Sequence, residues 1–560
     1  MQKLNPETTE RALAFPLFQL DAGEITNLPA AVIGATAASN TSNVIFSDGR
    51  VRPRPGLSLH PLSPSVAGGY SPTSSITHLG KFITTSQVNY TMRLQLDSTT
   101  GWTSVWAKTD TTEWEILVTS PLGHINTSPP MSAMFNEGEW LLVNGTDNLQ
   151  MWNGTSIYLV DVTNTQSNIS LRAPAQPAFI CTTGSRVFLG NAVDQNSGLR
   201  VPYRVWWSDT GDSTKWSNGA GLPAQGSAGY QDLFQGADAS PITGMYFQGE
   251  TTVIVFKKHS VYRGVFINGG PVWYNFLPIT QSRGCVAPGS IRAFNDTLIW
   301  LGDDYNVYSL SMGGQVSNMG DAIRPRIQQL VNLSDAVALG KVSAVVDTVL
   351  GLYWLMLPSA ADNSTVILCC NLHTGAWSEG HVGGAAIQPL CGLWVYPESS
   401  VISFTGISRP TAIWGCSDGR IYALDHTKPQ MIDYTVPWDA YWWGRTQDFM
   451  QIMQLGYAGK LPMQVHGETG EWHKISLHGT VGEAIPRVRM GKSLNDLVNN
   501  KHLYTFECID ADNNTPAYSA SVRADAERFS QLGVYWPPGT ASPMAVDGIT
   551  VWGMSRQVAR

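Results

Sequence analysis

The sequence predicts an all-β protein: an irregular β-propeller with an N-terminal extended arm and a smaller C-terminal β-sandwich-like domain. Three observations lead to this prediction. The 560 residues include 54 Gly, 32 Pro and 20 Trp, while only 14% of them are charged. Short apolar runs alternate with polar turns along much of the chain, and hairpins of one kind recur. Short strands separated by polar turns are typical of sandwiches, barrels and propellers.

Residues 240–317 show the strand pattern most clearly. Residues 252–256 form an apolar β-branched run, which suits a strand buried on both faces. The polar turn Lys257-Lys258-His259-Ser260 leads into an alternating run at 260–266, which predicts the returning strand of a hairpin. Further strands are expected at 273–279, 290–293, 297–300 and 307–310.

The recurring hairpin has a strand with an aromatic residue, a Gly/Asp/Asn turn, and a second strand that ends in Tyr or Trp. It occurs at 140–152, 299–308 and 413–422, and in weaker form at 186–207 and 351–377. Propeller blades repeat about every 40–50 residues. We therefore predict a propeller of six to eight blades, with an array of sandwiches as the alternative.

The chain is expected to divide into three parts. Residues 1–55 have little periodicity and predict an arm that ends in Arg52-Pro53-Arg54-Pro55, either a rigid extended crossing or a simple linker. Residues 56–425 form the propeller, interrupted by a helix at 320–331 with Asp321 as its cap and Pro325 in its first turn. Residues 426–560 form the second β-domain. Its strands are expected at 463–466, 472–477, 487–490, 502–509 and 548–552.

Charge and cysteine content exclude several function classes. A net charge of −8 gives no global basic footprint for nucleic acid and argues against an anionic membrane surface. We expect neither a signal peptide nor membrane insertion, because no apolar run has the required character or length. The cysteines show no Cys-x-x-Cys pair, which predicts reduced thiols rather than a disulfide framework or a zinc site. They are Cys181, Cys285, Cys369, Cys370, Cys391, Cys416 and Cys508.

The candidate catalytic carboxylates have a structural explanation. A glycosidase needs two carboxylates that face each other across a sugar. The candidates lie in predicted hairpin turns, where Asp is common, and nothing in the sequence pairs them. They are Asp303, Asp304, Glu379 and Asp418. Residues 208–216 resemble the Asp-box of sialidase propellers with one residue fewer, and we expect a turn held by Asp209.

Two further patterns predict no binding chemistry. A group of His and Glu residues would scatter over both faces of a strand hairpin, which argues against a metal site. Its members are His466, Glu468, Glu471, His473 and His478. Gly491-Lys492-Ser493 lacks the upstream glycine of a P-loop. The sequence thus predicts no catalytic, cofactor-binding or metal-ligating residue, and no cofactor.

Two tryptophan pairs, Trp206-Trp207 and Trp442-Trp443, could stack on sugars. Adjacent residues of a strand point to opposite faces. We expect one member of each pair in the core and the other at a subunit interface, where Trp is enriched, rather than on a sugar.

Several segments resemble tail-hub proteins of short-tailed bacteriophages, called nozzle or packaged-DNA stabilisation proteins. The resemblance lies in Val255–Tyr262, in the Arg-Gly-Cys-Val-Ala-Pro-Gly-Ser-Ile run at 283–291, and in the hairpin at 299–308. Tyr305 stands where this family usually has Gly. The entry segment Arg52–Gly56 and the runs Arg487–Lys492 and Tyr504–Phe506 extend the resemblance over most of the chain.

The resemblance implies a non-enzymatic structural virion protein. Family members form a ring, usually a homohexamer, below the portal and the head-to-tail adaptor ring. The ring closes the DNA channel, retains the packaged genome and lets DNA pass on ejection. The implied partners are the adaptor ring, tail fibre or tailspike proteins and, transiently, genomic DNA. The implied location is the virion tail, after synthesis in the host cytoplasm. The alternative function is a glycan-binding or glycan-degrading propeller of the tailspike or sialidase type.

Overall fold

The computed structural model shows two compact units. The propeller unit comprises residues 57–367 and 384–424, and the sandwich unit comprises residues 1–56, 368–383 and 425–560. The structure describes residues 13–66, 68–109, 112–123, 129–136, 138–156, 158–217, 227–234, 238–249, 251–267, 274–359, 364–382, 387–395, 410–424, 431–433, 436–437, 439–448, 469–480, 484–491, 502–505, 517–521, 529–539 and 545–556.

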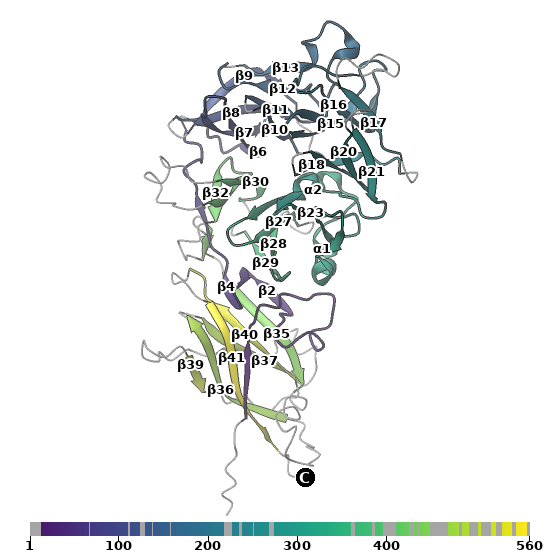
Figure 1. Ribbon diagram of the computed structural model, residues 1–560. Coiled ribbons are helices and arrows are strands. Elements are labelled where there is room, and N and C mark those ends of the chain that lie inside the picture. Colours follow the sequence, from purple (N-terminus) through teal and green to yellow (C-terminus); the bar gives the residue numbers. More distant parts are fainter. Residues whose placement is uncertain are drawn as a thin grey trace, which may run out of the picture. The chain divides into compact units, whose positions relative to one another are not determined.

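Seven four-stranded antiparallel sheets, here called blades 1 to 7, follow one another along the described chain (Figure 1). Blade 1 contains β6 (Ser74–Ile83), β7 (Asn89–Asp97), β8 (Thr103–Thr109) and β9 (Glu115–Leu122), and blade 2 contains β10 (Met131–Phe135), β11 (Glu139–Val143), β12 (Gln150–Trp152) and β13 (Val160–Asp161). Blade 3 contains β14 (Phe179–Thr183), β15 (Arg186–Val193), β16 (Arg200–Trp207) and β17 (Gly229–Asp232), and blade 4 contains β18 (Ile242–Gln248), β19 (Thr252–Lys257), β20 (Val261–Phe266) and β21 (Tyr274–Thr280). Blade 5 contains β22 (Arg292–Phe294), β23 (Thr297–Leu301), β24 (Val307–Leu310) and β25 (Val316–Asn318). Blade 6 contains β26 (Ser343–Asp347), β27 (Leu352–Pro358), β28 (Thr365–Asn371) and β29 (Trp377–His381). Blade 7 contains β30 (Pro389–Val395), β31 (Thr411–Cys416), β32 (Ile421–Leu424) and, from the start of the propeller unit, β5 (Leu57–Leu59).

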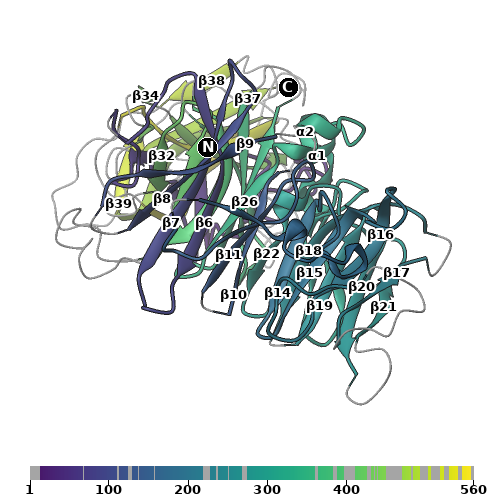
Figure 2. The same cartoon turned by 90° about the horizontal axis from the view of Figure 1, so that it is seen from above.

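The blades form a closed ring. Between most neighbouring blades the first strands are in contact: β10 contacts β6 and β14, β14 contacts β18, and β26 contacts β22 and β30. Blades 4 and 5 meet through a shared core cluster that includes Ile254 and Trp300. Figure 2 shows β14 beside β18. The ring closes where β30 contacts β6, and where β5 pairs with β32 in the register Leu57↔Leu424 and Leu59↔Tyr422. The predicted propeller is confirmed, and its seven blades lie within the expected six to eight.

Inner blade strands are buried on both faces because each blade is covered by two neighbours. In β19, Val253 and Val255 pack into the cluster shared with blade 3, whereas Ile254 and Phe256 pack into the cluster shared with blade 5. Alternating side chains of one apolar run therefore serve two interfaces. This arrangement confirms the strand predicted at 252–256. Lys257, expected in the following turn, instead ends β19 and is buried, with its ammonium donating to Leu233 O at 2.7 Å.

The same geometry corrects the prediction for the tryptophan pairs. Trp206 and Trp207 are both buried, the first in the cluster with blade 2 and the second in the cluster with blade 4. Trp442 and Trp443 are also both buried. The expectation that one member of each pair lies at a subunit interface is wrong, because both faces of these strands are already covered.

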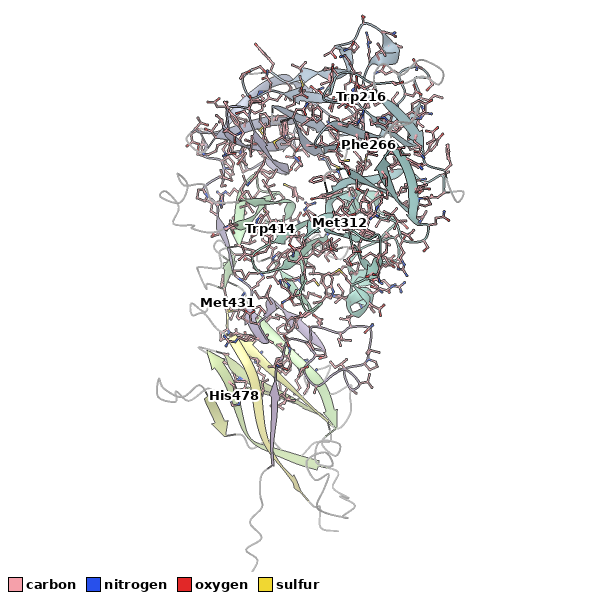
Figure 3. All side chains as sticks on the ribbon, viewed as in Figure 1. Trp216, Phe266, Met312, Trp414, Met431 and His478 are labelled. Carbon is pink, nitrogen blue, oxygen red and sulfur yellow. The ribbon has the colours of Figure 1, made fainter. Side chains whose placement is uncertain are left out.

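The recurring hairpins occupy one structural position in three blades. They are β11–β12, β23–β24 and β31–β32, and their aromatic residues face each other as Trp140↔Trp152, Trp300↔Tyr308 and Trp414↔Tyr422. Figure 3 labels Trp414 within blade 7.

Tyr305, in the β23–β24 turn, has a φ of 67°, and Gly419 at the same place in blade 7 has a φ of 75°. The left-handed backbone at this position explains why glycine is favoured there.

The predicted helix is confirmed and its predicted cap is wrong. A 3₁₀ turn at Asp321–Ile323 runs into α1 (Arg324–Leu330), with Pro325 in the first turn of α1. Asp321 lies in the 3₁₀ turn, so the N-cap position of α1 falls on Ile323 instead. Ile323 makes no side-chain cap hydrogen bond. A second short helix, α2 (Ala336–Gly340), was not predicted; the Asp335 carboxylate accepts from the backbone N–H groups of its first turn.

Two sheets build the sandwich unit. One contains β1 (Leu13–Phe18), β3 (Val44–Ser47), β4 (Arg50–Pro53), β36 (Thr469–Thr480), β39 (Ala517–Ser521) and β41 (Ala545–Arg556). The other contains β2 (Asn40–Ser42), β35 (Ala440–Asp448), β37 (Ile485–Gly491), β38 (His502–Thr505) and β40 (Phe529–Trp536). A two-stranded ribbon, β33 (Ile432–Asp433) and β34 (Val436–Pro437), accompanies them. Their shared core includes Phe46, Val51 and Ile549 from the first sheet and Trp442 and Trp536 from the second.

The described part of the predicted N-terminal arm belongs to this sandwich. Six residues of β1 pair with β41, β2 pairs with β35, and β4 pairs with β3 and β41 (Figure 1). The expected domain division therefore fails at residues 1–55, where strands of three to six residues are too short to show periodicity. Of the strands expected after residue 426, the one at 463–466 lies outside the described residues.

Candidate functional site

The four candidate carboxylates are engaged locally and are not brought together. In the β23–β24 turn, Tyr308 donates to Asp304 Oδ2 at 2.7 Å, and in the β31–β32 turn Tyr422 donates to Asp418 Oδ2 at 2.6 Å. Burial, and then the hydrogen bond to Asp304, raises the pKa of Tyr308 to about 12. These two aspartates hold their hairpins together, as predicted for turn residues.

The other two carboxylates have histidine partners. Asp303 Oδ2 lies 2.5 Å from His259 Nδ1, and Glu379 Oε1 lies 3.2 Å from His381 Nε2. Asp303 is in the β23–β24 turn of blade 5, and Glu379 is on β29, the last strand of the blade 6 sheet, in the segment 368–383 that is grouped with the sandwich unit.

The Asp-box-like segment is a structural turn, as predicted. Asp209 Oδ1 accepts from the backbone N–H of Thr210 at 2.8 Å and of Ser227 at 2.9 Å. Trp216 is fully buried and donates from Nε1 to Ser213 O at 2.7 Å (labelled in Figure 3). The aspartate thus joins the turn to the segment that leads into β17.

The remaining predicted candidates are distributed as follows. His473 and His478 lie on β36, while His466 and Glu468 fall outside the described residues. Gly491 ends β37, and Lys492 and Ser493 are also not described. Among the described residues, no group of three or more His, Cys, Asp or Glu is arranged to hold a metal ion.

Six of the seven cysteines are described, and all six are buried and form no disulfide with one another; Cys508 is not described. Within the ranges that the structure describes, no helix is both long and apolar enough to span a membrane.

The propeller unit contains a central cavity that no sequence pattern predicted. It has a volume of about 420 Å³ and is lined by residues of the first strands of blades 1, 2, 4, 5, 6 and 7, together with the segments that precede some of them. Sequence reasoning missed the cavity because its lining comes from stretches spread between residues 77 and 394. The one local sequence feature that could have indicated the cavity is Arg292, a cation at the start of a short blade strand.

Positive charge faces this cavity although the chain is acidic overall. Its described lining contains Lys81 and Arg292 and no Asp or Glu. The Arg292 guanidinium donates to two backbone carbonyls, Ile291 O at 2.6 Å and Gly392 O at 3.5 Å. Arg292 is half-buried, and the partial loss of water around its guanidinium lowers its pKa.

His78 lies beside this cation. Burial, and then the charge of Arg292, lowers the pKa of His78 to about 4, so the imidazole is neutral at pH 7. His78 Nε2 lies 2.8 Å from Ser132 Oγ. A Cβ on Gly80 would stand 2.8 Å from the same oxygen, so any larger residue at position 80 would clash with the Ser132 hydroxyl.

The cavity offers binding groups rather than reactive ones. Burial raises the pKa of the Cys391 thiol to about 12, which keeps it protonated and a poor nucleophile. Tyr246 and Trp394 supply aromatic surface, and Ser132 and Ser343 supply hydroxyls. The described lining thus combines cations, hydroxyls and aromatic rings.

The fold defines a seven-bladed all-β propeller with a β-sandwich unit. No protein-family model and no curated protein matches the chain. Solved structures with similarity include virginiamycin B lyase from Staphylococcus aureus, at 7% identity and a TM-score of 0.35, covering 74% of this chain and 99% of that one. Another is YCF48 bound to D1 peptide, at 12% identity and a TM-score of 0.35, covering 67% and 99%. An exo-β-1,3-galactanase from Phanerochaete chrysosporium, at 13% identity and a TM-score of 0.23, covers 66% and 94%.

Proposed function

We propose that this protein is a structural subunit of a bacteriophage tail, of the nozzle or tail-hub type. It assembles as a ring, six copies in the family it resembles, below the portal and adaptor. The ring closes the DNA channel, retains the packaged genome and opens on ejection. The proposed location is the virion tail, with the adaptor ring and tail fibres or tailspikes as neighbours.

The observation that supports this proposal is the use of the 283–291 motif as a joint between blades. A Cβ on Gly284 would stand 2.2 Å from Lys258 O in blade 4, and one on Gly289 would stand 2.1 Å from Val342 O just before blade 6. Ser290 O accepts from Tyr353 of blade 6 at 2.8 Å. The motif that carries the resemblance thus joins three blades, which suits a protein whose role is to be a rigid building block.

Large apolar side chains at separate places on the propeller unit are also exposed and available for subunit contacts. Leu199, Met312, Phe247 and Leu277 are exposed by 68%, 54%, 49% and 49%. Contacts between subunits are richer in such side chains than the rest of a protein surface. Acidic charge facing the bore of a ring would repel DNA phosphates and let the genome slide, so closure would come from projecting loops.

Ring assembly is tested by the mass of the purified protein, alone and mixed with the adaptor ring, from light scattering and negative-stain imaging. F247E and L277E are made separately, because Phe247 and Leu277 lie on the two edge strands of blade 4, and each should weaken assembly where it places charge in a subunit contact. T251E, which adds charge at an exposed turn residue, is the matched control. A wild-type protein that stays monomeric with and without the adaptor overturns the proposal.

The central cavity favours a second candidate function, a glycan-binding propeller. Aromatic rings such as those of Tyr246 and Trp394 can stack on sugar faces, and the hydroxyls can bond to sugar hydroxyls. The described lining lacks the two carboxylates of a glycosidase, so this candidate is binding rather than cleavage. Binding on a glycan array without sugar release, by a protein that forms no ring, would favour it over the nozzle.

A further inference from the structure

We propose that the central cavity of the propeller unit is a binding site for a small organic anion, whose carboxylate or phosphate group pairs with Arg292. The proposal depends neither on ring assembly nor on a tail location.

The first argument is the unbalanced charge of Arg292. Among the described residues it has no carboxylate partner, and its hydrogen bonds go to the carbonyls of Ile291 and Gly392. A guanidinium carries five N–H donors, so two such bonds leave donors for a ligand. Arg292 is only partly exposed to water, and a bound anion would supply the counter-charge that this cation lacks.

The second argument is the contrast with other arginines of the propeller unit. Arg204 forms ion pairs with Asp194 at 2.8 Å and Asp232 at 2.5 Å. The negative charge of Asp209 favours the charged form of Arg186, which also donates hydrogen bonds to Ser208 O and Thr210 Oγ1. Arg93, a third arginine of this unit, is fully buried without a carboxylate partner among the described residues, and its guanidinium instead lies over the rings of Trp106 and Trp114. Among the described residues Arg292 has neither kind of partner, and it lines a cavity.

The third argument is the chemistry of the rest of the lining. Lys81, an exposed residue of β6, adds a second cation to the lining. Thr77 lines the same cavity, and its hydroxyl is buried without a partner among the described residues. Neutral His78 and Ser132 provide further hydrogen-bonding groups beside Arg292.

The size fits a small organic molecule. Ligand sites of this kind span about 300–1,000 Å³, and this cavity measures about 420 Å³. Planar guanidinium groups bind carboxylates and phosphates through two parallel hydrogen bonds. The aromatic rings of Tyr246 and Trp394 then suit the organic part of the ligand, such as the ring of an acidic sugar.

The test is isothermal titration of the full chain with sodium phosphate, sodium glucuronate and glucose, each at matched ionic strength. We expect phosphate or glucuronate to bind and glucose to bind at least tenfold more weakly. Binding of glucuronate but not phosphate identifies a carboxylate ligand, and the reverse identifies a phosphate ligand. If neither anion binds, or if glucose binds equally well, the proposal is overturned.

Variants assign the binding to this cavity. R292Q should weaken anion binding at least tenfold, and K81Q should weaken it less. The matched control is R263Q, which removes an arginine of β20 that donates to Met312 O and does not line the cavity. If R292Q does not fold, an anion-dependent rise in the melting temperature of wild type that is reduced in K81Q supports the site. Equal binding by wild type and R292Q, or equal melting shifts in wild type and K81Q, contradicts it.

Discussion

Replacing Arg54 should strongly destabilise the sandwich unit. Its guanidinium forms a bidentate pair with Asp433, with Nη1–Oδ1 at 3.0 Å and Nη2–Oδ2 at 2.5 Å, and the two side chains are 1% and 0% exposed. Arg54 also donates to Asn43 Oδ1 at 3.0 Å and to His381 O at 2.7 Å. These bonds join the Arg-Pro-Arg-Pro segment to three other stretches of the unit, which a simple linker would not do.

The expected loss follows from this burial. Removing one member of a buried pair leaves the other charge unpaired, which costs about 3–5 kcal/mol, whereas replacing both with apolar groups can be nearly neutral. We therefore expect R54M to lower the free energy of unfolding of the sandwich unit by about 3–5 kcal/mol, and R54M/D433L to recover much of that loss.

The assay is urea unfolding of the full chain, with the transition of the sandwich unit followed by tryptophan fluorescence. The control is K108A, measured in the transition of the propeller unit to which it belongs, since Lys108 lies 3.9 Å from Glu113 and that carboxylate is 69% exposed. An exposed pair contributes less than about 1 kcal/mol. A loss below about 1 kcal/mol for R54M, or a double variant much less stable than R54M, would refute the reasoning.

Three further predictions concern the propeller unit. Y422F and D418A should each destabilise it by about 1–3 kcal/mol, because each removes the Tyr422–Asp418 hydrogen bond that holds the turn, and the double variant should lose less than the sum of the two in a urea-unfolding cycle. L57D should open the ring to limited proteolysis because it places a charge at a buried position where β5 closes blade 7, whereas L59D, at a position 44% exposed in the same strand, should resist like wild type. Burial lowers the pKa of His60 from 6.5 to about 4, so the unfolded chain binds a proton that the folded chain does not. The contribution of neutral His60 to the free energy of unfolding is therefore present above pH 6.5 and is lost as the pH falls toward 4, by up to about 3 kcal/mol. In melting curves from pH 7.5 to 4.5, H60N should flatten this dependence; an unchanged slope contradicts the assignment.

Local patterns predicted the propeller well because blade strands follow one another along the chain. The run at 252–256 is recognisable because its two faces meet two neighbouring blades. The hairpins around Trp300 and Trp414 repeat because the same aromatic pair and turn recur in blades 5 and 7. The preference of Asp for hairpin turns also correctly predicted that Asp304 and Asp418 are structural turn residues.

Long-range pairing could not be predicted in this way. Nothing near Leu57 indicates Leu424 as its partner, and nothing near Leu13 indicates Gly553. The two buried tryptophans of each pair were misassigned because single-strand alternation does not reveal that both faces are covered. The cavity around Arg292 was missed for a related reason, since six blades contribute to it.

The most direct test of the proposed structural role is imaging of the full chain with its adaptor ring, with mass measured on the same sample. We predict a closed ring of several copies, six in the family it resembles, capping the adaptor around a common bore. A monomer that leaves the adaptor bare, at concentrations where the adaptor ring itself is intact, would contradict that role.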